Sequence, residues 1–103
     1  MAAFDRNPVS IEYFREMELP EVFRQLKSWP NESIYDGTRL ALPDEVVNYQ
    51  RGDGIEKALT LVNVAKARRI EVLLERHSDT ILIRHGKVRF DFTTVKKIEV
   101  HLG

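Results

Sequence analysis

Hydrophobic positions are densest between residues 54 and 69, where they follow a helical period. An apolar stripe that covers most of a helix circumference is typical of a buried helix. One face carries Ile55, Ala58, Leu59, Val62 and Ala65, and Leu61 and Val64 widen it. Asp53 is placed to cap the N-terminus, and Glu56, three residues later, completes an Asp-x-x-Glu form of the capping box. The pattern therefore predicts a central, buried helix over 54–69.

Three shorter helices and a hairpin are predicted before this helix. The helices are expected in the segments SIEYFREM, with Ser10 as N-cap, PEVFRQLKSW, which begins at Pro20, and PDEVVNYQ, which begins at Pro43. The segment SIYDGTRLA is expected to form a short hairpin, because Asp36–Gly37 suits the positive φ angles of a tight turn. The N-terminal half is thus expected to be mostly helical.

After residue 69, hydrophobic and polar residues alternate as they do in half-buried strands. Four strands are predicted, in the segments RIEVLLER, TILIRH, KVRFDF and KKIEVHL, with Gly86 in the turn between the second and third. Short connections favour an antiparallel meander. We therefore expect one α+β domain over residues 1–103, in which the N-terminal helices and the central helix pack on one face of about four strands.

Composition places the chain among ordinary globular proteins, since 43% of its residues are hydrophobic and 31% are charged. The absence of cysteine excludes disulfides, thiolate metal sites and cysteine nucleophiles. No apolar run approaches the ~20 residues that span a bilayer, and the start lacks the apolar stretch of a secretion signal. These features predict a cytoplasmic protein that does not enter membranes. The three histidines lack metal-ligand spacing, so no metal or other cofactor is expected.

Residues 48–94 resemble the transglutaminase-like superfamily of papain-fold cysteine enzymes. The matching stretches are RGDGIEKALTLVNVAKARRIEV and HSDTILIRHGKVRFDFTT, and the preceding GTRLALPDEVVNYQ resembles the short helix that leads to the family's nucleophile. Members of the family commonly carry Gly-Asp-Cys at the start of the long helix. A strand near a catalytic His follows, and then a turn and a strand that ends in a catalytic Asp. The resemblance covers about half of the chain.

Carried over residue by residue, the resemblance implies that Gly54 occupies the nucleophile position, His77 the histidine position and Asp91 the carboxylate position. Acyl transfer requires a thiolate beside an imidazole, and glycine offers no ionisable group. Alternation also places Asp91 on the strand face opposite Phe90 and Phe92, which is the solvated face. The resemblance therefore implies a degenerate domain that is not an enzyme and that has a binding or structural role.

The charge distribution suggests an alternative function. Residues 1–54 contain six basic and ten acidic residues, whereas residues 55–103 contain ten basic and six acidic ones. A basic C-terminal half could bind nucleic acid or another anion, through a face formed by Arg84, Lys87, Arg89, Lys96 and Lys97. The two halves could equally pack together and neutralise each other.

The sequence alone also suggests two smaller sites. Arg51, beside the helix start at Gly54, could help the free N–H groups of that helix to bind a phosphate or carboxylate. His77 and Asp91 could act as acid and base without a cysteine.

The expected partner is an unidentified protein, or a larger parent protein of which this chain forms a part. Lys96 and Lys97 stand at the start of the last predicted strand, where lysines discourage pairing between sheet edges. The chain is therefore expected to be a monomer.

Overall fold

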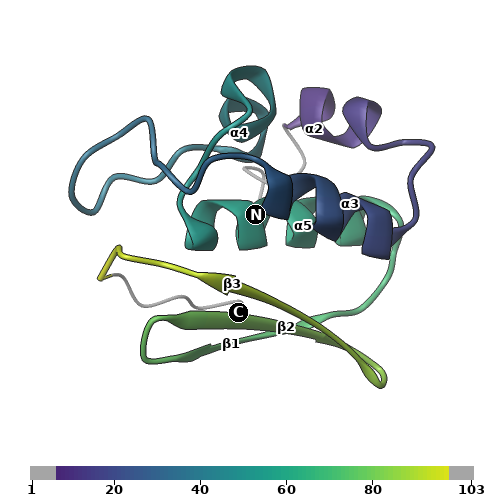
Figure 1. The fold of residues 1–103 in the computed structure, drawn as a ribbon. Helices are drawn as coiled ribbons and strands as arrows, with labels where there is room; N and C mark the ends of the chain where they lie inside the picture. The colour runs from purple at the N-terminus through teal and green to yellow at the C-terminus, as the bar shows by residue number, and fades with distance from the viewer. Residues whose placement is uncertain (1–6, 98–103) are drawn as a thin grey trace.

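The structure is a computed structural model that describes residues 7–97 (Figure 1). Within these residues the helices are α2 (Pro8–Tyr13), α3 (Leu19–Ser28), α4 (Pro43–Tyr49) and α5 (Gly54–Ala67). The strands are β1 (Leu73–His77), β2 (Thr80–His85) and β3 (Val88–Thr93), and they form one antiparallel sheet in the order β1-β2-β3. No helix in this part of the chain is long and apolar enough to cross a bilayer.

The helices lie together on one face of the sheet, as Figure 1 shows, and α5 contacts each of the other helices as well as β2 and β3. This arrangement confirms the predicted α+β class and the antiparallel meander. The described sheet has three strands instead of about four. Lys96 and Lys97 are not in a strand, and residues 98–102 of the predicted fourth strand lie outside the described residues.

The sheet buries one face against the helices. Ile81 lies opposite Phe92 and Ile83 lies opposite Phe90, and all four side chains are buried. Phe23 of α3 packs on this face, with its ring centroid 5.1 Å from that of Phe90 and 5.3 Å from that of Phe92. The alternation predicted for β2 and β3 is therefore confirmed.

The central helix is buried over nearly its whole surface. Every residue of α5 from Gly54 to Ala65 is buried except Leu59, and this set includes the polar residues Glu56, Lys57, Thr60 and Asn63. The predicted capping box is present: the side chain of Asp53 accepts from the N–H of Ile55, and that of Glu56 accepts from the N–H of Asp53. A helix so enclosed can form only if each of its polar side chains finds a partner within the fold.

The helix ends at Ala67, two residues before the predicted end. Arg69 adopts a left-handed conformation with φ 58°, and the N–H of Ile70 donates to the carbonyl of Ala65 at 2.9 Å. Left-handed residues of this kind terminate helices by satisfying their last carbonyls. The turn directs the chain from α5 towards β1.

The hairpin predicted for residues 33–41 is wrong. This segment contains bends and turns but no strand, although Gly37 does have a positive φ of 65°. A two-stranded hairpin would pair the backbone groups of the segment with each other. Here several of these backbone groups instead form hydrogen bonds with the side chains of Glu56 in α5 and of Lys96 after β3.

The N-cap predicted at Ser10 is also wrong. Helix α2 begins at Pro8, so Ser10 lies within its first turn. The first N–H groups of α2 are satisfied by the carboxylate of Asp44 in α4, which accepts from Val9 at 3.2 Å and from Ser10 at 2.8 Å. A side chain thirty-four residues away has replaced the local cap.

Candidate functional site at the start of α5

The N-terminus of α5 lies against the end of β3. A Cβ atom placed on Gly54 would overlap the backbone carbonyl of Thr93 and lie 2.9 Å from the Thr93 nitrogen. Real Cβ atoms do not approach backbone this closely, so only glycine permits the contact. Position 54 therefore has no room for the side chain of a nucleophile.

Asp53, the residue before Gly54, holds the segment that follows β3. Its carboxylate accepts hydrogen bonds from the hydroxyl of Thr94 and, at 2.9 Å, from the N–H of Val95. Asp53 and Thr94 are each 1% exposed. Hydrogen bonds to an ionised acceptor are stronger than neutral ones, above all where water is excluded. Residues 94–95 are thus fixed to the start of α5.

Glu56 ties a second segment to the same helix turn. Its side chain is fully buried, and Oε2 accepts from the Ser33 hydroxyl and from the N–H of Ala41, both at 2.7 Å. Oε1 accepts from the N–H of Asp53 at 2.8 Å. A buried carboxylate is tolerated only with such a set of donors. The loop of residues 33–41 is therefore anchored to α5 near both of its ends.

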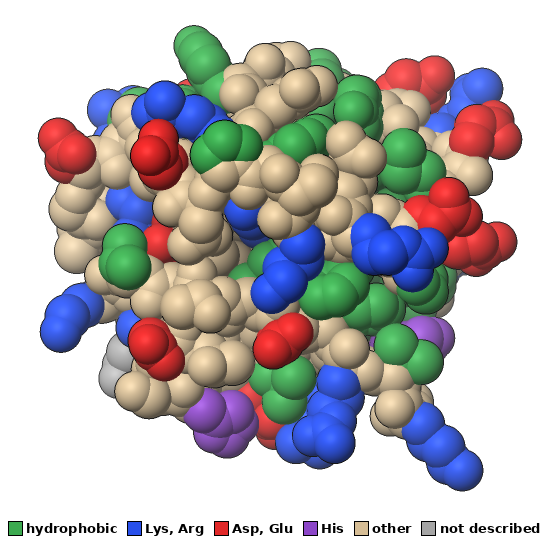
Figure 2. Space-filling view, viewed as in Figure 1, with side chains coloured by type: hydrophobic (Ala, Val, Ile, Leu, Met, Phe, Trp, Pro, Cys, Tyr) green, Lys and Arg blue, Asp and Glu red, His purple; other side chains and the backbone are tan. Residues whose placement is uncertain are grey.

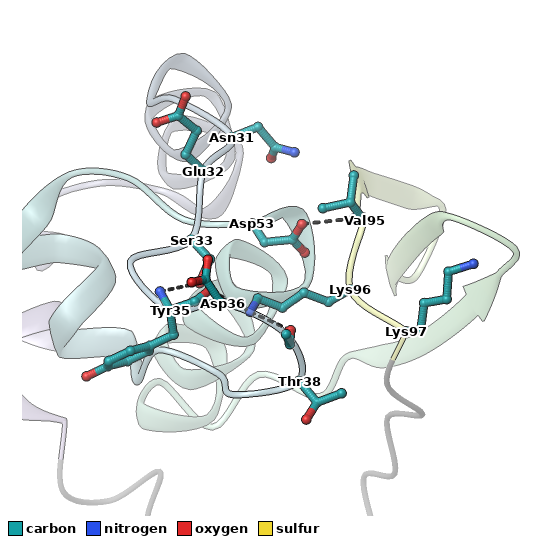
Figure 3. A pocket seen from close by; sticks show the side chains of 11 residues that line it. Asn31, Glu32, Ser33, Tyr35, Asp36, Thr38, Asp53, Val95, Lys96 and Lys97 are labelled. Atoms are coloured by element: carbon teal, nitrogen blue, oxygen red, sulfur yellow. Dashed lines mark hydrogen bonds between the residues drawn. The ribbon is translucent and has the colours of Figure 1, made fainter.

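Lys96 joins these two segments to each other. Its Nζ donates to the carbonyls of Tyr35 at 3.0 Å, Gly37 at 2.9 Å and Arg39 at 2.7 Å. An ammonium group has three donors, so each one meets a carbonyl. Lys96 is 6% exposed, and Figure 3 shows its side chain extending towards the loop while Lys97 points away.

An open cleft of about 540 Å³ lies between this loop and residues 95–97 (Figure 3). The exposed part of its lining includes Asn31, Glu32, Asp36, Thr38, Val95 and Lys97. Val95 is 78% exposed, and the buried carboxylate of Asp53 is already engaged by Ile55, Thr94 and Val95. The cleft is thus lined by exposed side chains and by buried polar groups that are paired within the chain.

The structure does not bring Gly54, His77 and Asp91 together. His77 lies on β1 and Asp91 on β3, with β2 between them, so the two strands are about 10 Å apart. The strand register places both side chains on the sheet face away from α5. The Nε2 of His77 lies 3.2 Å from the Glu75 carboxylate, so this histidine has a partner other than Asp91. His77 and Asp91 therefore do not form the predicted acid–base pair.

The anion site predicted at Arg51 and Gly54 is closed. The guanidinium of Arg51 donates to the carbonyl of Ser33 at 3.2 Å, and the backbone of Thr93 covers Gly54. The carboxylates of Asp53 and Glu56 bind N–H groups at the helix start that an anion would need. Two negative charges at this position also repel an anion.

The five basic residues predicted to form one face do not all lie on it. Arg84 and Arg89 are direct neighbours across β2 and β3, and Lys87 lies in the turn that joins these strands. Arg84 forms an ion pair with Glu75 at 3.3 Å. The side chain of Lys96 is buried against the loop, so the prediction that it lies on the basic face is wrong. In the view of Figure 2, side chains of both signs are interspersed.

Lys57, which no sequence pattern singles out, is 2% exposed within α5. Its Nζ donates to the carbonyl of Trp29 at 2.6 Å. Burial is the main cause that lowers the pKa of Lys57, and the nearby charge of Lys27 lowers it further, whereas Asp53 opposes the shift. A lysine among apolar helix positions gives no sign in the sequence that its ammonium will be enclosed.

The chain matches no family model, no curated protein and no solved structure. Among residues 7–97 no group of three or more His, Cys, Asp and Glu side chains could hold a metal ion.

Proposed function

We propose that this chain is a non-catalytic domain of transglutaminase-like type that binds a partner protein or forms a binding part of a larger parent protein. The observation that carries the proposal is the contact between Gly54 and Thr93. The helix that begins at Gly54 lies directly against the end of the strand that carries Asp91. The backbone of Thr93 fills the space at Gly54, the position at which the resemblance implies a nucleophile.

The polar groups around Gly54 support a binding role better than a catalytic one. Asp53, Glu56 and Lys96 are all buried, and each is hydrogen-bonded to other groups of the chain. A general base or nucleophile must reach a substrate within about 3 Å. These three groups instead shape the loop and the segment that form the cleft.

Nucleic-acid binding by the basic half, the alternative, has weaker support. Lys96 binds carbonyls of the loop and does not contribute to a basic face. Glu75 partly neutralises Arg84. Binding that depends on phosphate contacts weakens steeply with salt. The proposal predicts no mobility shift of a single-stranded oligonucleotide at ~50 mM salt, where such contacts are strongest.

The variant Gly54→Cys tests the absence of a latent active site. Its rate of alkylation at neutral pH is compared with that of Ala67→Cys, at the exposed last residue of α5. An activated cysteine would have a pKa well below the ordinary value of about 8.5 and would react faster than the control. We expect Gly54→Cys to react no faster than Ala67→Cys. Faster alkylation of Gly54→Cys in the folded protein would contradict the proposal.

A further inference from the structure

The three strands are not covered equally by the helices. Helix α5 packs on β2 and β3, whose inward residues Ile83 and Phe90 are buried, whereas β1 packs mainly on β2 at the edge of the sheet (Figure 1). Val72 and Leu74 lie at the margin of the core and are only half-buried. Leu73, on the outer face, is 59% exposed. Hydrophobic side chains are therefore accessible on both faces at the start of this edge strand, which is the pattern of a strand that pairs with another chain.

The free edge of β1 also presents backbone groups. Ser78 and Asp79 form a two-residue turn between β1 and β2, so the pair that flanks the turn, His77 and Thr80, is hydrogen-bonded. Bonded and non-bonded pairs alternate along an antiparallel ladder. The N–H and C=O groups of Leu74 therefore point away from β2, and none of the hydrogen bonds that join residues 7–97 engages them.

The opposite edge of the sheet is protected. Nζ of Lys27 donates to the carbonyl of Asp91 at 3.1 Å, and Nδ2 of Asn31 donates to the carbonyl of Thr93 at 3.1 Å. Lysines and covering elements of this kind keep sheet edges from pairing with other chains. Of the two edges, β1 is therefore the one left open for a further strand.

The expectation of a monomer does not extend to this edge. It depended on Lys96 and Lys97 at the start of a predicted strand, but neither residue lies in a strand. Strand β1 contains no lysine, and Nε of its one arginine, Arg76, turns back to donate to the carbonyl of Ser78 at 2.8 Å. β1 thus lacks the lysines that discourage edge pairing.

We propose that β1 pairs antiparallel with β1 of a second copy of this chain, around a two-fold axis at Leu74. The two Leu74 residues exchange N–H···O bonds, and the two sheets join into one. Such a contact uses the same surface on both copies, as most homodimers do. The inference goes beyond the proposed function and does not depend on it, because β1 is not part of the cleft at the start of α5.

The charges beside β1 select this register. With Leu74 opposite Leu74 of the second copy, Glu71 lies opposite His77 of the second copy, and a carboxylate can accept a hydrogen bond from an imidazole. Both side chains are on exposed residues. A shift of the register by two residues places Glu71 opposite Glu75, or Glu75 opposite Glu75. Like charges directly opposite each other are destabilising, so the pairing centred on Leu74 is favoured.

Sedimentation velocity tests the pairing at neutral pH, from about 10 µM to about 1 mM chain. We expect the unsubstituted chain to dimerise within this range. Glu71→Lys should weaken the dimer at least about tenfold, because a lysine then faces His77 at two symmetric positions. Adding His77→Glu to Glu71→Lys exchanges the charges and should restore the dimer. The control is Glu16→Lys, the same change of charge at a side chain that is 89% exposed, which should leave the dimer unchanged.

Amide hydrogen exchange of the unsubstituted chain gives a second readout that needs no variant. The Leu74 N–H should become protected as the chain concentration rises, whereas the Glu75 N–H, which faces β2, should be protected at every concentration. A chain that stays monomeric at about 1 mM would overturn the proposal and leave the edge to a strand of another protein. Dimerisation without protection of Leu74, or a Glu71→Lys variant that dimerises as well as Glu16→Lys, would overturn it too. So would failure of the charge exchange to restore the dimer.

Discussion

The backbone of Thr93 fills the space that a side chain on Gly54 would occupy. The neighbouring residues on both sides reinforce the contact, because the carboxylate of Asp53 binds the hydroxyl of Thr94. Segments 41 residues apart in the sequence are thereby locked at the start of α5. The buried start of α5 is thus joined to the end of β3 by backbone contact and by a side-chain hydrogen bond.

Glu56 is expected to be one of the largest single contributors to stability among the polar residues of this region. Glu56→Ala removes the acceptor of the Ser33 hydroxyl and of the Ala41 and Asp53 N–H groups. Leaving buried donors unsatisfied costs about 1–3 kcal/mol each before relaxation, so we expect a loss of about 4 kcal/mol in the free energy of unfolding. Urea denaturation at neutral pH measures it.

The control for this prediction is Glu32→Ala, which removes an exposed carboxylate next to the same loop. Exposed substitutions usually change stability by less than about 0.5 kcal/mol. A loss below about 1 kcal/mol for Glu56→Ala would show that its three hydrogen bonds, two to the loop and one to Asp53, contribute little to stability.

Lys57 gives the stability of the domain a distinctive dependence on pH. Burial lowers its pKa in the folded protein from the ordinary value of 10.5, so the unfolded chain binds more protons in the window between the lowered pKa and 10.5. The free energy of unfolding contributed by Lys57 therefore rises as the pH rises through this window, and the full penalty is present below it.

The measurement is the difference in unfolding free energy between the unsubstituted chain and Lys57→Met, from about pH 8 to 10.5. This difference should move in favour of the unsubstituted chain as the pH rises, because other groups cancel in the comparison. Lys87→Met, in the exposed turn before β3, controls for the loss of one positive charge. A difference that stays flat across the window would show that Lys57 is not desolvated in the folded state.

Local signals in the sequence were sufficient to predict the structural features that local contacts determine. The capping box of Asp53 and Glu56 and the inward faces of β2 and β3 follow from residues two to four positions apart, and both are confirmed. Alternation likewise placed Asp91 on the outer face. These features depend on helix and strand periods that the chain cannot change.

Features set by distant contacts could not be predicted in this way. Asp36–Gly37 carries a good turn signal, yet the loop around it pairs with Lys96, whose bonds span 57 to 61 residues. Nothing near Lys96 in the sequence distinguishes it from the exposed Lys97. The close approach of Thr93 to Gly54 depends on how the sheet is set against α5, which no pattern within either element encodes.

The free energy of unfolding of Gly54→Ala tests the closure of position 54 most directly. In an unobstructed helix, replacing glycine with alanine stabilises by about 0.5–1 kcal/mol. Here the added Cβ meets the backbone of Thr93, so we expect a loss of about 2–3 kcal/mol. Gly52→Ala is the control. Its Cβ would lie 3.3 Å from a side-chain atom of Val46, so this substitution should lower the free energy of unfolding much less. If the Gly54→Ala variant is as stable as the unsubstituted chain, or more stable, the backbone of Thr93 does not close position 54.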